Sequence, residues 1–317
     1  MKRCARCNSL MPGDVTQCIK CGFDSSPLIA PLAGAPRAGR WASGWALARE
    51  SWRVLLLDKE LLVFPLLSGI ASFLVLATFI GGVWASGMFE RRQAPGEALE
   101  WALLFLYYFA NYFVIVGFNS ALIACAMIRF RGGDPTLADG LRALRERLPQ
   151  IVSWALLAAT VGVVLRIIEE RVGFVGKIVI AVLGAVWTIA TYFVVPVLVV
   201  EGLGPIEAAK RSAEILKDAW GESLVSNVGI GLVTTVVTLL IVVPVGIAFL
   251  ALALKTASIA VALIGLAAVL AILVLSALIG SALSSIALCA LYLYATEGKV
   301  PRAFAGAGVQ HAFAARP

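Results

Sequence analysis

Long apolar stretches are the feature that most constrains the fold of this 317-residue chain. The first four cover residues 61–84, 101–128, 150–168 and 177–200. Apolar residues then run from 223 to 294 with one charged interruption, Lys255. A helix of about 20 apolar residues crosses a bilayer, because each residue adds about 1.5 Å to a required length of about 30 Å. We therefore expect an all-α integral membrane bundle with six transmembrane helices, the last two covering 223–253 and 258–295.

The composition of the chain excludes a soluble globular protein. Hydrophobic residues make up 61% of the sequence and charged residues 14%, whereas about a quarter of the residues in soluble domains are charged. An alternative with seven spans divides the stretch after Pro244 into three short helices. That arrangement places Lys255 inside the hydrocarbon at a cost of several kcal/mol, so six spans are favoured.

The distribution of Lys and Arg predicts how the spans are oriented. In the six-span arrangement, 20 of the 26 Lys and Arg residues lie on the side of the membrane that carries both chain ends. Positive residues accumulate on the cytoplasmic side of membrane proteins. We expect a multi-pass protein of the cell membrane with cytoplasmic N- and C-termini. The net charge of +7 is attributed to this orientation rather than to nucleic-acid binding.

Three connections on the expected cytoplasmic side have apolar residues at helical spacing. These are Trp41, Trp45, Ala48, Trp52 and Leu55, then Leu137, Leu141, Leu144 and Leu148, then Ile206, Ala209, Ala213, Leu216 and Trp220. Charged residues occupy the remaining faces, which predicts cytoplasmic interfacial helices along the membrane surface. One interpretation is a threefold repeat of an interfacial helix and a membrane hairpin. The alternative is that any six-span protein with charged cytoplasmic loops shows this pattern.

A short cysteine motif, Cys4-x2-Cys7-x10-Cys18-x2-Cys21, precedes the apolar region. Four thiolates in two such pairs are typical of a closed tetrahedral site, and Zn²⁺ is its usual occupant. An iron site of the rubredoxin type and a pair of disulfides are the alternatives, and a cytoplasmic location argues against the disulfides. A closed site leaves no position for a substrate, so we expect a structural zinc ion held by Cys4, Cys7, Cys18 and Cys21.

The predicted domains follow from these two regions. Residues 1–26 form a small zinc ribbon that depends on metal for stability, because so few residues bury little apolar surface. Residues 27–43 are rich in Pro, Gly, Ala and Ser and form a flexible linker. Residues 44–298 form the six-helix transmembrane domain, and residues 299–317 form a C-terminal tail.

Few residues of the apolar region could carry chemistry. The only histidine, His311, lies in the C-terminal tail, so no histidine-based acid, base or metal site is expected within the bundle. The sequence contains no P-loop, nucleophile elbow or H-E-x-x-H motif. Asparagines inside spans commonly form hydrogen bonds between helices, which is the favoured interpretation of Asn111, Asn119 and Asn227.

A charged cluster ends the third span and consists of Arg166, Glu169, Glu170 and Arg171. Its long side chains can reach water from the end of a span, so the cluster is interpreted as a solvated helix end. A membrane enzyme is the third hypothesis, and activity that is lost on mutation of Glu169 or Glu170 would support it. We expect no enzymatic activity, because paired carboxylates within the membrane and a histidine are both lacking.

The cysteine motif, with Pro12 midway and Gly22 after its last cysteine, resembles the short bacterial zinc ribbon. The resemblance implies a structural or protein-contacting role. The following region resembles an uncharacterised bacterial and archaeal family of six-helix membrane proteins over about residues 45–297. The motifs that carry this resemblance are Ser51-Trp52-Arg53, Asp58-Lys59-Glu60-Leu61, Phe64-Pro65-Leu66-Leu67-Ser68, Val195-Pro196, Glu201-Gly202-Leu203-Gly204-Pro205-Ile206-Glu207-Ala208, Arg211-Ser212 and Trp220-Gly221-Glu222.

The motif from Glu201 to Ala208 is also similar to one in the membrane domain attached to some glycerophosphodiester phosphodiesterases. The soluble catalytic barrel of those enzymes has no counterpart here, so the resemblance implies a six-helix bundle and no established activity. Glu207 and Arg211 are four residues apart on an expected helix and are predicted to pair. Glu201 is predicted to meet a helix end or a basic residue of another cytoplasmic connection.

Our leading functional hypothesis is a non-enzymatic scaffold or regulator. Its bundle is anchored in the lipid bilayer, and its zinc ribbon contacts a cytoplasmic partner protein. The alternative is a transporter or lipid-handling permease, because Pro196 and Pro244 are expected to kink their spans and the asparagines lie at membrane depth. This alternative predicts a polar cavity between the second and fifth spans that reaches past mid-membrane. The sequence predicts no oligomeric state.

Overall fold

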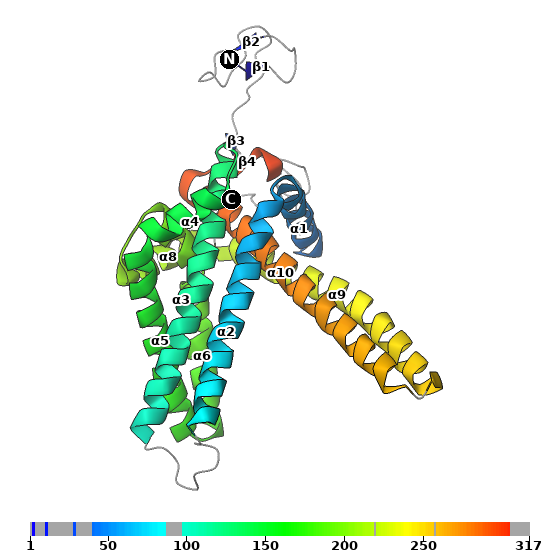
Figure 1. Ribbon diagram of the computed structural model, residues 1–317. Helices are drawn as coiled ribbons and strands as arrows, with labels where there is room; N and C mark the ends of the chain where they lie inside the picture. Colours follow the sequence, from blue (N-terminus) through cyan, green and yellow to red (C-terminus); the bar gives the residue numbers. More distant parts are fainter. Residues whose placement is uncertain are drawn as a thin grey trace.

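The structure is a computed structural model that describes residues 2–3, 10–11, 28–29, 40–86, 97–218, 220–256 and 258–304. Side chains are described for residues 28, 44–86, 98–217, 231–256 and 258–304. The described residues are mostly helical, in agreement with the all-α prediction (Figure 1).

Six helical segments are long and apolar enough to cross a membrane, which confirms the six predicted spans. They are α2 (Val63–Ala85), α3 (Glu97–Phe130), α5 (Leu148–Arg171), α6 (Phe174–Ala190) with α7 (Val194–Val200), α9 (Trp220–Thr256) and α10 (Ile259–Glu297). Helix α9 continues through Pro244 without interruption, and Lys255 lies in its last turn. Because α9 and α10 are each one continuous helix, the seven-span alternative is wrong.

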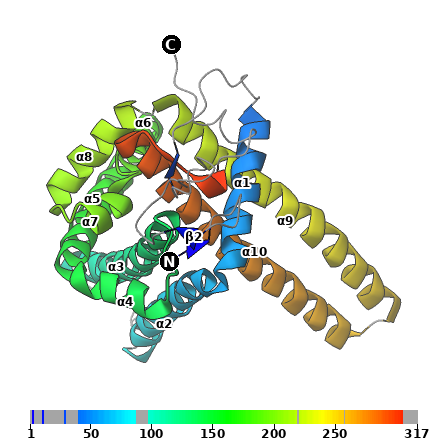
Figure 2. The same cartoon turned by 90° about the horizontal axis from the view of Figure 1, so that it is seen from above.

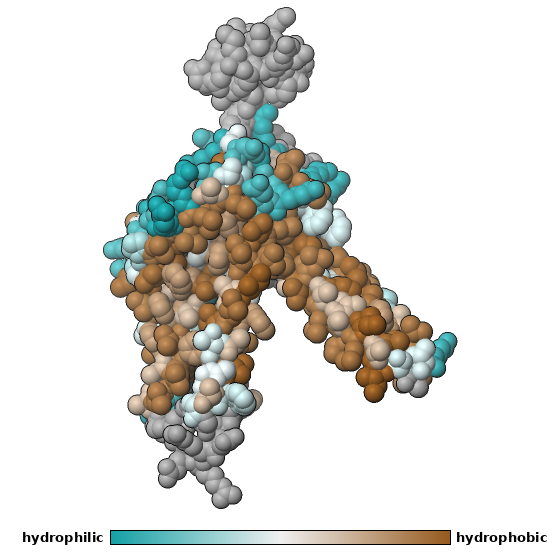
Figure 3. All heavy atoms as spheres, viewed as in Figure 1, coloured by the Kyte–Doolittle hydropathy of each residue, from teal (hydrophilic) through white to brown (hydrophobic). Residues whose placement is uncertain are grey.

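Three shorter helices lie together at one end of the bundle (Figure 1). Helix α1 (Arg40–Leu57) precedes the 3-10 helix η1 (Lys59–Leu62), α4 (Leu137–Glu146) connects α3 to α5, and α8 (Pro205–Asp218) connects α7 to α9. They confirm the three helices predicted from the spacing of apolar residues. Hydrophilic residues gather over this end, whereas hydrophobic residues cover the spans (Figure 3). We call the end formed by α1, α4 and α8 the polar end.

Local sequence explains where two of these helices begin. The hydroxyl of Thr136 accepts a hydrogen bond from the backbone amide of Asp139, and the Asp139 carboxylate accepts one from the amide of Thr136. This capping box satisfies amides at the start of α4 that have no partner within the helix. Helix α8 starts with Pro205, because a first helical turn needs no amide hydrogen at that position.

Two strands from distant parts of the chain pair at the polar end. Strand β3 (Leu28–Ile29) pairs antiparallel with strand β4 (Val300–Pro301). Two residues of the predicted linker therefore form a strand. Val300 is buried, and Phe304 of the 3-10 helix η2 (Arg302–Phe304) is fully buried, so the start of the predicted tail packs into the core. A second antiparallel pair, β1 (Lys2–Arg3) with β2 (Leu10–Met11), lies within the predicted ribbon.

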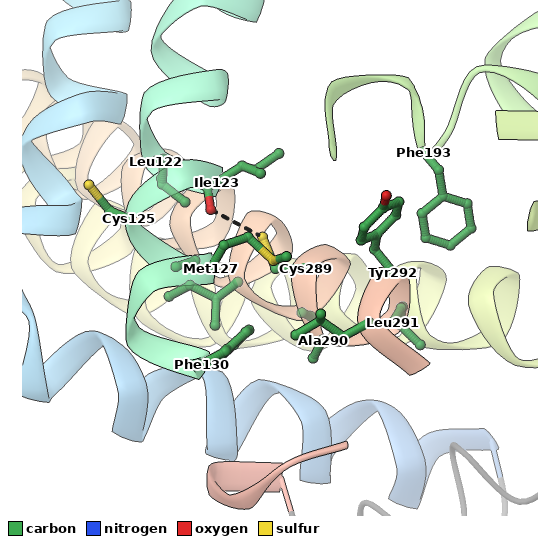
Figure 4. Packing of buried hydrophobic residues seen from close by; sticks show 14 of the residues in the cluster. Leu122, Ile123, Cys125, Met127, Phe130, Phe193, Cys289, Ala290, Leu291 and Tyr292 are labelled. Carbon is green, nitrogen blue, oxygen red and sulfur yellow. Dashed lines mark hydrogen bonds between the residues drawn. The ribbon is translucent and has the colours of Figure 1, made fainter. Parts of the chain in front are cut away.

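The buried core is concentrated toward the polar end, where the last turns of α3 and α10 cross (Figure 4). Phe130 of α3 packs edge to face on Phe304. Cys289 of α10 is fully buried, and its thiol is 3.8 Å from the carbonyl oxygen of Ile123. Cys125 is also buried and free. Both isolated cysteines are therefore small packing residues of the core.

The last hairpin leaves the bundle obliquely, as Figures 1 and 2 show. We call residues 231–256 of α9 and 259–281 of α10 the arm. Helix α10 has 39 residues, and at about 1.5 Å per residue such a helix is longer than the roughly 30 Å of hydrocarbon. Most of its arm residues are exposed, whereas burial becomes almost continuous from Ala282 to Leu293. One helix thus serves both the arm and the core.

Candidate functional site

The charged residues of the polar end are organised into junctions between helices. The first junction joins the turn before α2 to the end of α3. The guanidinium of Arg129 donates two hydrogen bonds to the carboxylate of Asp58 and contacts the exposed carboxylate of Asp134. The Asp58 side chain is only 6% exposed, so its charge requires this partner. The carboxylate of Glu60 adds a further link, because it accepts a hydrogen bond of 3.2 Å from the backbone amide of Leu137.

The second junction fills a break between α6 and α7. Helix α6 ends at Ala190, and α7 begins at Val194, two residues before Pro196. A break at this place agrees with the kink expected in this span, because proline has no backbone amide hydrogen to donate within a helix. Ser212 of α8 is fully buried beside the break. Its hydroxyl donates to the carbonyl of Ala190 at 2.7 Å and accepts from the amide of Phe193 at 2.9 Å. One side chain therefore satisfies two backbone groups that the break releases.

The third junction corrects two predicted contacts. Arg211 pairs with Glu201 at 3.3 Å and with Glu214 at 3.6 Å, and not with Glu207 as predicted. The basic partner of Glu201 is Arg211, which belongs to the same connection between spans and not to another one. Glu201 also accepts a hydrogen bond of 2.8 Å from the phenol of Tyr292. The network ties the end of α7 to α8 and to the core segment of α10.

Arg147 was not singled out from the sequence, yet it holds the same connection in place. Its guanidinium donates to the carbonyl of Val199 at 3.1 Å. Gly202, with φ of +68°, lies against it, since a β-carbon at Gly202 would be 2.3 Å from a guanidinium nitrogen. The positive φ favours glycine at this position, and a β-carbon here would also displace the Arg147 guanidinium from its present place.

The polar candidates within the spans form hydrogen bonds locally. Asn119 accepts a hydrogen bond of 3.1 Å from Ser285 of α10, as expected for an asparagine between helices. Asn111 differs from that expectation, because its amide donates to the carbonyl of Tyr107 in its own helix rather than to another helix. Near Asn119, a cavity of about 230 Å³ lies between α2, α3 and α10 and includes Ser68 and Ser281 in its walls. The side chain of Asn227 lies outside the described residues.

The charged cluster at the end of α5 is internally neutralised. Arg166 pairs with Glu169 at 3.2 Å and with Glu170 at 3.0 Å, and all three side chains are exposed. Arg171 ends the helix. Both carboxylates that a membrane enzyme could use are therefore surface groups paired with one arginine.

The larger cavity, of about 520 Å³, lies between α1 and the arm. This position differs from the polar cavity predicted between the second and fifth spans. The second span, α3, packs against the sixth span, α10, rather than against the fifth, α9. The walls of the larger cavity are mostly apolar, and Arg49 is the charged residue among them.

The predicted zinc ligands Cys4, Cys7, Cys18 and Cys21 lie outside the described residues. Within the described ranges, no group of three or more His, Cys, Asp or Glu side chains could hold a metal ion. The zinc site stays a prediction from the cysteine spacing.

Residues 98–302 match a family of unknown function (DUF6159). The chain belongs to this family. The match confirms the expected membership of an uncharacterised family, and it covers five of the six spans. It begins after α2, so it does not include the motifs from Ser51 to Ser68. Comparisons with curated proteins and with solved structures found no match.

Proposed function

We propose that this multi-pass protein is a non-enzymatic membrane scaffold or regulator whose zinc ribbon contacts a cytoplasmic partner protein. The supporting observation is the set of junctions at the polar end. Arg129 joins the end of α3 to the turn before α2, Ser212 joins α8 to the break between α6 and α7, and Glu201 joins the end of α7 to Arg211 of α8 and Tyr292 of α10. These contacts fix the helices of the polar end relative to one another. A rigid surface at the polar end suits the presentation of a docking module.

The same junctions argue against acid–base chemistry at the polar end. Asp58 and Glu201 each form an ion pair with an arginine, and Glu201 also accepts a hydrogen bond from the phenol of Tyr292. A general acid or base must be free to exchange its proton with a substrate, whereas the oxygens of these carboxylates accept hydrogen bonds from fixed donors of the protein itself. In this proposal Cys4, Cys7, Cys18 and Cys21 hold one structural Zn²⁺, and the polar end faces the cytoplasm.

Metal analysis of the purified full chain tests the first part of the proposal. We expect one zinc per chain in the wild type and none in a Cys7→Ser, Cys21→Ser double variant. His311→Ala is the matched control, because it removes another metal-ligand type near the opposite end of the chain without touching the motif. Retention of zinc by the double variant would reject the assigned ligands.

Cross-linking in cells tests the second part. We expect a photo-reactive group at Gln17, between the cysteine pairs, to form a cross-link to one protein, and the double cysteine variant to lose it. The same group at Glu214, an exposed position of α8, serves as a control for general proximity. If deletion of residues 1–26 left every cross-linked or co-purified protein unchanged, the partner-docking proposal would fail.

A second candidate is a transporter or lipid-handling permease. It is favoured by the cavity of about 230 Å³ between α2, α3 and α10, whose polar residues lie within the spans. Such groups at membrane depth can line a path for a polar solute or headgroup. Flux of a panel of solutes and labelled lipids into proteoliposomes tests this candidate. Asn119→Leu should abolish flux, whereas Asn111→Leu, which affects a bond within one helix, should leave it intact.

A further inference from the structure

The larger cavity of about 520 Å³ has a definite place in the fold. Helix α1 packs against both α9 and α10 at the end of the arm that joins the bundle. One wall of the cavity is a single face of α1, and the other walls are arm residues of the two long helices together with Leu283 of the core segment of α10. Because hydrophilic residues cover the polar end and hydrophobic residues cover the arm, the cavity lies at the boundary between the two surfaces (Figure 3).

The interior of this cavity suits a hydrocarbon chain. Its volume falls in the range of about 300 to 1,000 Å³ that is usual for small-molecule sites. The arm contributes Val237, Ile241, Ile272 and Leu275 among other apolar side chains. The hydroxyl of Thr238 points back to the carbonyl of Thr234 at 2.7 Å, so it is satisfied within its own helix.

The side of the cavity formed by α1 has the chemistry of a lipid headgroup region. Trp45 and Trp52 are 56% and 40% exposed, and indole rings favour the level of the headgroups because they are apolar with one polar N–H. Arg49 lies between them on the same face of the helix. A guanidinium can donate two parallel hydrogen bonds to a phosphate.

Arg49 differs from its neighbour on α1 in having no carboxylate partner among the described residues. Arg53 donates two hydrogen bonds to Glu50, at 2.7 and 2.8 Å, and is not part of the cavity wall. The wall contains no Asp or Glu that could hold the ammonium group of a zwitterionic headgroup. The local charge therefore complements a headgroup that is negative overall.

We propose that this cavity binds one anionic glycerophospholipid. Its phosphate is held by Arg49 between the two tryptophans, and one acyl chain enters the space between α1 and the arm. The bound lipid fixes the arm relative to α1, because it contacts both. This site is separate from the proposed ribbon partner and does not depend on it.

Photo-cross-linking tests the proposal on the full chain in phosphatidylcholine vesicles. The probe is phosphatidylglycerol with a diazirine on one acyl chain, and phosphatidylcholine with the same group is the comparison. We expect phosphatidylglycerol to label peptides that contain residues 45–52 or 272–283 preferentially. Arg49→Gln should lower this labelling about tenfold, the effect of losing one charge-assisted contact to phosphate. Arg53→Gln removes an equal charge from the same helix and should leave the labelling unchanged.

A second pair of variants tests the cavity itself. Ser276→Leu places a larger side chain in the wall and should reduce labelling of those peptides by both probes. Ala267→Leu adds the same bulk at an exposed position of the arm and should have no effect. Equal elution of all variants in size-exclusion chromatography verifies their fold. Equal labelling by the two lipids, or unchanged labelling in Arg49→Gln or Ser276→Leu, would overturn the proposal.

Discussion

The hydroxyl of Ser212, on α8, accepts a hydrogen bond of 2.9 Å from the backbone amide of Phe193, which lies in the break between α6 and α7. The same hydroxyl donates to the carbonyl of Ala190. The break between α6 and α7 is thus completed by a side chain from α8. Such a contact connects the course of a span to the position of a helix at the polar end.

Replacement of Ser212 by alanine should therefore destabilise the bundle. The amide of Phe193 and the carbonyl of Ala190 would lose their partner in a buried site, at an expected cost of about 1 to 3 kcal/mol. Unfolding in detergent, followed by tryptophan fluorescence, measures the change. Thr160→Ala is the control, because its exposed hydroxyl bonds only to a carbonyl of its own helix. Equal stability of the two variants would show that Ser212 does not support the break.

The ion pair between Asp58 and Arg129 should be worth more than an exposed pair. Asp58→Ala leaves a guanidinium that is only 27% exposed with the exposed carboxylate of Asp134 as its remaining acidic partner. We expect a loss of about 1 to 3 kcal/mol, less than the roughly 3 to 5 kcal/mol of a fully buried pair. A double-mutant cycle with Arg129→Ala isolates the interaction. The matching cycle for Glu170 and Arg166, whose side chains are 48% and 49% exposed, should give less than about 1 kcal/mol, and a coupling as small for Asp58 would contradict the assignment.

Gly202 and Gly298 allow the steric role of Arg147 to be separated from backbone strain. Both glycines have positive φ, +68° and +63°, and alanine in that conformation costs about 1 to 2 kcal/mol. A β-carbon at Gly298 meets no atom within 4 Å, whereas one at Gly202 meets the Arg147 guanidinium. Gly202→Ala should thus lower the melting temperature further than Gly298→Ala. Equal melting temperatures for the two variants would show that the Arg147 side chain moves aside at no cost and does not hold the connection.

The start of α4 should loosen in acid. Hydrogen bonds from the hydroxyl and the amide of Thr136 lower the pKa of the Asp139 carboxyl below its ordinary value. A lowered folded pKa means that the stabilisation is complete above the ordinary value of about 3.9 and is lost as the pH falls through the folded value. Hydrogen-exchange protection of α4, corrected for intrinsic rates, should fall in that range. Asp139→Asn should remove this pH dependence, and its persistence in the variant would point to another group.

The spans were predictable because length and apolarity report the bilayer directly. The direction of the arm was not, since a helix that faces lipid and a helix that faces other helices carry similar apolar residues. The break at Phe193 was indicated by Pro196, but its partner Ser212 follows only from tertiary packing. The predicted pair of Glu207 and Arg211 failed for a related reason. Helical spacing favoured it, and Glu201, brought close by the turn at Gly202, took its place.

The zinc motif differs from these contacts, because its prediction depends only on local sequence. Cys4, Cys7, Cys18 and Cys21 are close in sequence, so their spacing alone makes a specific prediction. The residues that connect the ribbon to the bundle gave a weaker signal. Leu28 and Ile29 lie in a segment rich in Pro, Gly, Ala and Ser, and only their pairing with Val300 and Pro301 reveals a strand. Pairings across almost the whole chain leave no local pattern.

Membrane sidedness tests the central claim most directly, because a scaffold for a cytoplasmic partner must expose its polar end to the cytoplasm. One cysteine is introduced at His311 or at Ser258, next to the tip of the arm, in chains whose four motif cysteines are replaced by serine. The two remaining cysteines, Cys125 and Cys289, are buried, and a chain with neither introduced cysteine measures their background labelling. Sealed, right-side-out membranes are then treated with an impermeant thiol reagent. We predict that Ser258→Cys is labelled at once and that His311→Cys is labelled only after permeabilisation. Immediate labelling of His311→Cys with protection of Ser258→Cys would contradict the proposed orientation and the function built on it.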